Sequence, residues 1–101
     1  MKHKKLPPVH PGKLLLKEFL EPMGISQRKL AADIGVPPRR INEIVLGKRG
    51  ISADTTLRLG RYFGMSPGFW LNLQKRFEMD VAMDRIGNRL EREVKTRASA
   101  A

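Results

Sequence analysis

The chain has 101 residues, with 20 basic and 10 acidic side chains, a net charge of +10 and no cysteine. This length suits one helical domain, and the absence of cysteine excludes structural disulfides and thiolate metal sites. No apolar run approaches the roughly 20 residues that a membrane span needs. Prolines soon follow the N-terminal lysines, which is unlike a signal peptide. We therefore expect a soluble cytoplasmic protein with no membrane partner.

The positive charge is concentrated in two segments. Residues 1–20 carry five Lys and one Glu, and residues 26–50 carry six basic and two acidic side chains, so each segment has a net charge of +4. This distribution indicates a polyanionic partner such as DNA. The alternative is a basic balance that serves only solubility.

The first predicted elements are an arm and a helix. Residues 1–9, with three lysines and two prolines, predict a basic flexible arm. His10 is placed to enter a helix that starts at Pro11 and runs to about residue 21. Pro22 and Gly24 are expected to end it. Its apolar stripe consists of Leu15, Leu16, Phe19 and Leu20.

Residues 27–46 have the pattern of a helix-turn-helix motif. Leu30 and Ile34 lie four residues apart and share a face of the first helix, whereas Ile41 and Ile44 lie three apart and share a face of the second. The turn signals agree with this layout. They are an N-cap at Ser26, a small Ala31 between the helices, a left-handed turn at Gly35, a core residue at Val36 and a helix start at Pro37 or Pro38.

Two further helices complete the predicted domain. Ser52 is expected to cap a fourth helix, with Asp54 at its positive end. The inward side chains of this helix are predicted to be Leu57, Leu59 and Phe63. A fifth helix begins at Ser66 and Pro67 and carries Phe69, Trp70, Leu73 and Phe77. Strand-like alternation is missing, so the fold class is all-α, with a five-helix domain over residues 10–79.

A second apolar stripe follows this domain. It predicts an amphipathic helical extension over residues 80–101, with Gly87 in its interior and a frayed end from residue 95. The stripe consists of Met83, Ile86, Leu90 and Val94. A stripe beyond the needs of the core indicates a partner interface, and folding back onto the domain is the alternative. The dimer-interface candidates are Trp70, Phe69, Leu73, Met83, Ile86 and Leu90, although a lone Trp in a helical core is typical of packing.

The second motif helix carries the candidate contacts to DNA bases. Its outward positions are Pro38, Arg39, Asn42 and Glu43. Arg39 can bond guanine O6 and N7, and Asn42 can bond adenine N6 and N7. Glu43 could accept from cytosine N4 or orient Arg39. The predicted phosphate contacts are Gln27 at the start of the first motif helix, Arg40, Lys48 and Arg49. A solvated surface role is the alternative for each of these residues.

Catalysis is not predicted. The acidic residues form no metal-ligand set with the two histidines, and no nucleophile stands beside a base. Neither histidine has the spacing of a zinc site. We therefore expect a protein that is not an enzyme, with no catalytic residue, metal or cofactor.

Several linked motifs resemble the HigA antitoxin family, also called VapI or plasmid-maintenance antidote proteins. This family belongs to the Xre or lambda-repressor type of helix-turn-helix domain. The resemblance covers about residues 9–80, and the chain has Lys13 where relatives commonly have an acidic residue. The motifs stand at residues 10–12, 24–26, 36–44 (Val-Pro-Pro-Arg-Arg-Ile-Asn-Glu-Ile), 46–49, 52–55 and 67–73.

The resemblance implies a lambda-repressor-like fold and two tasks. Such an antitoxin binds double-stranded operator DNA as a homodimer and represses its own operon, and it is nucleoid-associated while bound. It also neutralises a HigB-type toxin, a ribosome-dependent mRNA endonuclease. The half-sites of a dimer should lie about 34–36 Å apart. The alternative is a stand-alone Xre-type transcriptional regulator without a toxin partner.

Overall fold

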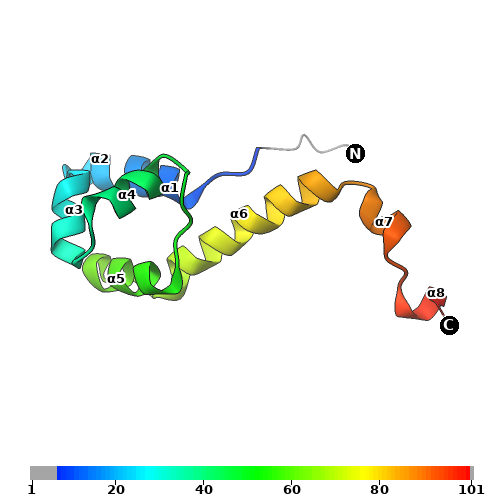
Figure 1. The fold of residues 1–101 in the computed structure, drawn as a ribbon. Helices are drawn as coiled ribbons and strands as arrows, with labels where there is room; N and C mark the ends of the chain where they lie inside the picture. The colour runs from blue at the N-terminus through cyan, green and yellow to red at the C-terminus, as the bar shows by residue number, and fades with distance from the viewer. Residues whose placement is uncertain (1–6, 101) are drawn as a thin grey trace.

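The computed structural model describes residues 7–100, and helices make up all the regular secondary structure of that range. The all-α prediction is thereby confirmed (Figure 1). Of the predicted arm, residues 1–6 lie outside the described residues. The elements are α1 (Pro11–Leu14), η1 (Leu15–Leu20), α2 (Glu21–Met23), α3 (Gln27–Ile34), α4 (Pro38–Val45), α5 (Ala53–Phe63), α6 (Gly68–Ile86), α7 (Arg89–Glu93) and α8 (Arg97–Ala100).

The elements α1, η1 and α2 follow one another without a break and form the first helical segment. His10 enters it as predicted, because its Nδ1 accepts from the Gly12 amide at 2.9 Å. The middle part, η1, is a π-helix, in which hydrogen bonds span five residues instead of four. Residues five apart thus become neighbours, and Leu15 and Leu20 are both buried.

Pro22 does not end this segment. It lies within the continuous helical segment, in α2, where it contributes no N–H to the helical hydrogen bonds but does not interrupt the helix. The segment ends at Gly24, which has a φ of 66°. The prediction that both residues would stop the helix was therefore wrong for Pro22.

The helix-turn-helix consists of α3 and α4, and its local signals act as predicted. The Ser26 hydroxyl accepts from the Lys29 amide at 3.0 Å and so caps α3. Gly35 ends α3 in the left-handed conformation, with a φ of 74° that a side chain would strain. Pro38 is the first residue of α4, and Pro37 lies just before it. The turn between the two helices is thus determined by residues within it.

The hydrophobic core joins the helix-turn-helix to the helices around it. Trp70 is fully buried in this core, and the ring centroids of Trp70 and Phe19 are 5.0 Å apart. A fully buried side chain cannot contact a second copy, so Trp70 is removed from the dimer-interface candidates. The core residues are Leu15, Leu20, Leu30, Ala31, Ile34, Val36, Ile41, Ile44, Ile51, Leu59 and Trp70.

Helix α5 follows the prediction with one exception. Ser52 caps it by accepting from the Thr55 amide at 3.3 Å, Leu59 is buried and Phe63 packs against the core. Leu57, however, is 59% exposed. Residues two apart on a helix point in different directions, so Leu57 cannot share the face of Leu59. The other buried positions of α5 are Thr55, Thr56 and Gly60.

Helix α6 is longer than the predicted fifth helix. It passes residue 79 without interruption and ends at Gly87, which was expected inside a separate extension. The second apolar stripe is therefore divided between elements: Met83 and Ile86 lie on α6, Leu90 lies on α7, and Val94 follows α7. The predicted frayed end contains the helical turn α8.

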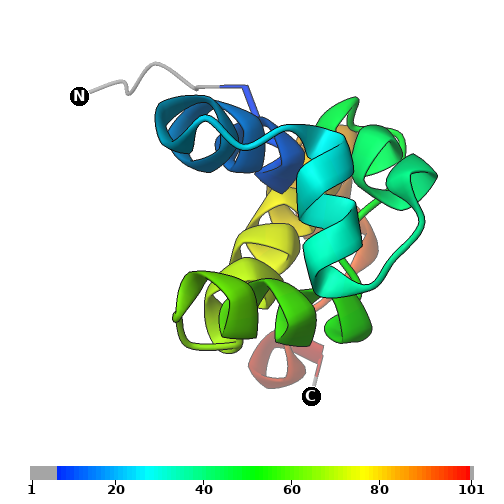
Figure 2. The same ribbon diagram turned by 90° about the vertical axis from the view of Figure 1, so that its left-hand side faces the viewer.

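The C-terminal half of α6 projects away from the other helices, and α7 and α8 lie beyond it (Figure 1). Figure 2 looks toward α3, with the far part of α6 receding behind the domain. The radius of gyration is 17.3 Å, against about 13 Å for a compact chain of this length. The projecting segment thus has much of its surface available for a partner.

Two tertiary contacts fix helix α4 and the loop after it. A Cβ at Gly12 would lie 1.8 Å from the main-chain oxygen of Ile44, so α1 approaches the end of α4 very closely. The buried Gln74 of α6 accepts from the Ile51 amide at 2.8 Å through Oε1 and donates to Glu78 at 2.9 Å through Nε2. Sequence reasoning missed Gln74.

Candidate nucleic-acid interface

Helix α4 has one buried and one exposed side. Ile41 and Ile44 face the core, whereas the four predicted base-contact residues lie on the other side. Pro38, Arg39 and Asn42 are exposed, and Glu43 is half-buried between them and the following loop. The structure therefore brings these four side chains together on one outward face, as the sequence predicts.

Glu43 is bound by two arginines. Its Oε2 accepts from Arg39 Nε at 2.9 Å, one turn earlier in α4. Its Oε1 accepts from Arg49 Nε, also at 2.9 Å. The hydrogen bond from Arg39, with help from Arg49, holds the pKa of Glu43 below its usual value, so the carboxylate stays charged. Of the two roles that the sequence left open for Glu43, this geometry favours orientation of Arg39.

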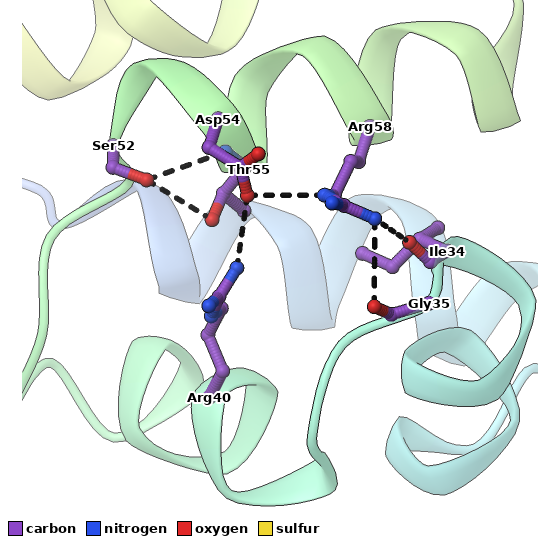
Figure 3. A network of polar contacts seen from close by, with 7 residues as sticks. All are labelled: Ile34, Gly35, Arg40, Ser52, Asp54, Thr55 and Arg58. Atoms are coloured by element: carbon purple, nitrogen blue, oxygen red, sulfur yellow. Dashed lines mark hydrogen bonds and ion pairs between the residues drawn. The ribbon is translucent and has the colours of Figure 1, made fainter.

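A second polar network ties α4 to its neighbours (Figure 3). Arg40 Nη1 and Arg58 Nε both donate to Asp54 Oδ2 at 3.0 Å. The hydrogen bond from Arg58, and then that from Arg40, lowers the pKa of Asp54. Arg58 Nη1 also donates to the main-chain oxygens of Ile34 at 2.9 Å and Gly35 at 3.4 Å. This network fixes α4 against α5 and the end of α3.

Sequence reasoning missed Arg58. Its four-residue spacing from Asp54 indicates a helical ion pair, which was a signal available in the sequence. Its contact with the α3 carbonyls had no such signal. Arg40, a predicted phosphate contact, is already paired within the molecule, and only a guanidinium edge not bonded to Asp54 remains for a phosphate.

The other predicted phosphate contacts lie at the start of α3 and in the loop after α4. Gln27 is the first residue of α3, where main-chain N–H groups point outward. The amides of Lys48 and Arg49 donate to the Glu43 main-chain oxygen at 2.8 and 3.2 Å, which folds their loop back onto the end of α4. Within residues 7–100, the Lys48 ammonium has no carboxylate partner within 4.0 Å.

Other kinds of site find little support in the described part of the chain. Among residues 7–100, His, Asp and Glu side chains nowhere gather in the threes that a metal ion would need. None of the described helices combines the length and apolar character required to cross a bilayer. The cationic face around α4 is therefore the principal candidate site.

Comparison with known proteins identifies the family. The family model HTH_3, described as helix-turn-helix, matches residues 16–70. Virulence-associated protein I of Dichelobacter nodosus is 50% identical over 78 residues, which are 77% of this chain and 72% of that protein. Antitoxin HigA-1 of Vibrio cholerae is 35% identical over 79 residues, which are 78% of this chain and 74% of that protein. The chain belongs to the HigA family of Xre-type helix-turn-helix antitoxins.

A solved structure agrees with this membership. Antitoxin HigA of Pseudomonas aeruginosa, determined with the higBA promoter, superposes with a TM-score of 0.85 and 42% sequence identity. The match covers 89% of this chain and 98% of that one, so it includes the projecting end of α6 as well as the domain. The HigA family consists of DNA-binding regulators and antitoxins, not enzymes.

Proposed function

We propose that this protein is the antitoxin of a type II toxin–antitoxin module, which represses its own operon by binding operator DNA as a dimer. The observation that carries the proposal is the outward face of α4, where Arg39 and Asn42 are exposed while Ile41 and Ile44 are buried in the core. The P. aeruginosa HigA with its promoter supports the same function for this chain.

The proposed base contacts lie on this face. Arg39 bonds a guanine through O6 and N7, Asn42 bonds an adenine through N6 and N7, and Pro38 contacts a base edge with its ring. Glu43, with both oxygens held by arginines, orients Arg39. The proposed phosphate contacts are Gln27, Arg40, Lys48 and Arg49, which set the register of α4 in the major groove.

We further propose that the dimer forms along α6. Leu73 and Met83 of α6 face Val9, Pro11 and Leu14 across a groove that the charged residues Arg76, Asp80 and Asp84 also line. Met79, which sequence reasoning missed, is 60% exposed on the same helix. A second copy would cover these side chains and place two recognition helices on one face of the duplex. The proposed interface therefore consists of Phe69, Leu73, Met79, Met83, Ile86 and Leu90.

The DNA-binding proposal is tested with the duplex upstream of the gene. The full chain is titrated into this duplex and into an unrelated duplex of equal length, at the same salt concentration. We expect binding to the upstream duplex to be at least about 1,000-fold tighter. Footprinting should show two half-sites about 34–36 Å apart. Equal affinity for the two duplexes would contradict the proposal.

The toxin proposal is tested with the short gene next to this one. This protein acts in the bacterial cytoplasm and is nucleoid-associated when bound to DNA, so the two products would meet there. We expect expression of the neighbouring gene alone to arrest growth and to cause cleavage of mRNA. Co-expression of this chain should restore growth and leave the mRNA intact. Failure of rescue, together with tight operator binding, would indicate a stand-alone Xre-type regulator.

A further inference from the structure

Arg49 stands outside the recognition helix but is connected to it through Glu43. Both Nε and Nη2 of Arg49 lie 2.9 Å from Glu43 Oε1. The other oxygen, Oε2, accepts from Arg39 Nε. A single carboxylate therefore bridges a loop arginine and the more exposed of the two arginines of α4.

The atom through which Arg39 is held matters for base contact. A guanidinium has one N–H at Nε and four at Nη1 and Nη2. Because Glu43 takes the Nε donor, the Nη1 and Nη2 groups stay available as the pair that a guanine accepts through O6 and N7. The Arg39 side chain is 84% exposed, so Glu43 is the contact that restricts its direction.

Glu43 is in turn restrained by the loop. Its side chain is 24% exposed, and the Lys48 and Arg49 amides both bond its main-chain oxygen. Arg49 closes this arrangement by binding the carboxylate itself. Without Arg49, one carboxylate oxygen would lose its partner and the Glu43 side chain could turn away from Arg39.

We propose that Arg49 is a positioning residue that determines the base specificity of Arg39 through Glu43, without touching a base. This inference rests on the proposed function. It gives Arg49 a role that its neighbour Lys48 lacks, although both carry one positive charge on the same loop. A phosphate contact alone would make the two residues equivalent in their effect on sequence preference.

The test compares these two neighbours in the full-length protein. Affinities of Arg49→Ala and Lys48→Ala are measured for the upstream duplex, for the same duplex with single guanines replaced, and for an unrelated duplex. We expect both variants to bind the unrelated duplex more weakly and to a similar degree. Only Arg49→Ala should lower the ratio of upstream to unrelated affinity, on the order of three- to tenfold. The lost preference should be that for the guanine that Arg39 contacts, as the duplexes with single guanines replaced will show.

Two additional variants separate positioning from charge and from folding. Arg49→Lys keeps the charge, so it should retain affinity for the unrelated duplex while losing part of the sequence preference. In a Glu43→Ala background, where the bridge is already absent, Arg49→Ala should cause no further loss of preference. Circular dichroism of every variant establishes that the helices are intact.

Several results would overturn the inference. One is an equal loss on every duplex for Arg49→Ala and Lys48→Ala; another is a loss of preference for Arg49→Ala that persists in the Glu43→Ala background. In both cases the wild-type chain still prefers the upstream duplex, so the proposed function stands. A wild-type chain without any preference would overturn the proposed function and this inference together.

Discussion

Gly12 in α1 lies against the main-chain carbonyl of Ile44 in the last turn of α4, with no room for a side chain between them. The first helix therefore sets the position of the end of the recognition helix. The loop with Lys48 and Arg49 begins a few residues beyond this contact. Any change at residue 12 should consequently affect both stability and the geometry of the DNA-binding face.

We predict that Gly12→Ala destabilises the protein by about 1–3 kcal/mol, because the new methyl group would overlap backbone that cannot rotate away. Urea denaturation measures the change in the free energy of unfolding. Gly68→Ala is the matched control, since the nearest atom to its new Cβ would be 3.7 Å away. Equal stabilities of the two variants would show that α1 and α4 separate without cost.

Arg39 and Lys48 should differ in the kind of affinity that they contribute. We expect Arg39→Ala to cost about 1–3 kcal/mol of specific binding and to relax the preference at one operator position. Lys48→Ala should weaken binding to DNA of every sequence to a similar degree. It should also reduce the steepness of the plot of log affinity against log salt concentration by about one. Fluorescence anisotropy over a series of salt concentrations measures both effects. A uniform loss for Arg39→Ala would contradict its contact with a base.

The titration of His10 should make stability depend on pH. Burial lowers the pKa of His10 from 6.5, although a hydrogen bond with the Arg49 backbone opposes the shift. The unfolded chain thus takes up a proton on His10 more readily than the folded chain does. The stabilisation of the folded state by neutral His10 is therefore fully present above pH 6.5 and is lost as the pH falls through the lower pKa of His10 in the folded chain. A protonated Nδ1 also could not accept from the Gly12 amide.

The measurement is the melting temperature between about pH 8 and about pH 5. His10→Asn is the matched control, because Asn can cap the helix but does not titrate in this range. We expect the decline toward low pH to be smaller in His10→Asn than in the wild type. Identical pH profiles would exclude His10 as the source.

The buried Gln74 should contribute more to the stability of the fold than its exposed neighbours on α6 do. We predict that Gln74→Leu costs about 1–3 kcal/mol, because the buried Ile51 amide would lose its acceptor. Asn72→Leu, at an exposed position of the same helix, is the control and should change stability little. Thermal and urea unfolding both report the difference. A neutral Gln74→Leu would show that Ile51 finds another acceptor.

The proposed dimer face is tested with two methionines of similar exposure. Met83 on α6 is 55% exposed and Met23 on α2 is 53% exposed. A charge in an apolar interface is unfavourable, so Met83→Glu should raise the dimer Kd at least about tenfold. Met23→Glu should leave it unchanged. Analytical ultracentrifugation measures both constants, and equal behaviour of the variants would place the interface elsewhere.

Local signals in the sequence are enough to predict the helix-turn-helix and the exposed face of its second helix. Ser26, Gly35 and Pro38 act through hydrogen bonds and backbone angles within a few residues, so their effects can be inferred without a fold. The three- and four-residue spacing of apolar side chains on α3 and α4 likewise decides which positions remain outside. Arg39 and Asn42 were therefore located correctly on the exposed side of α4.

Contacts between residues far apart in the chain follow only from the packing of the helices. Arg58 reaches the Ile34 carbonyl 24 residues away, and Gln74 reaches the Ile51 amide 23 residues away, so neither contact has a local signal. The π-helical segment, the outward Leu57 and the end of α6 at Gly87 also depend on how the helices pack. The physical reason is range: caps and periodicity act along a few residues of chain, whereas these contacts depend on the path that brings separate helices together.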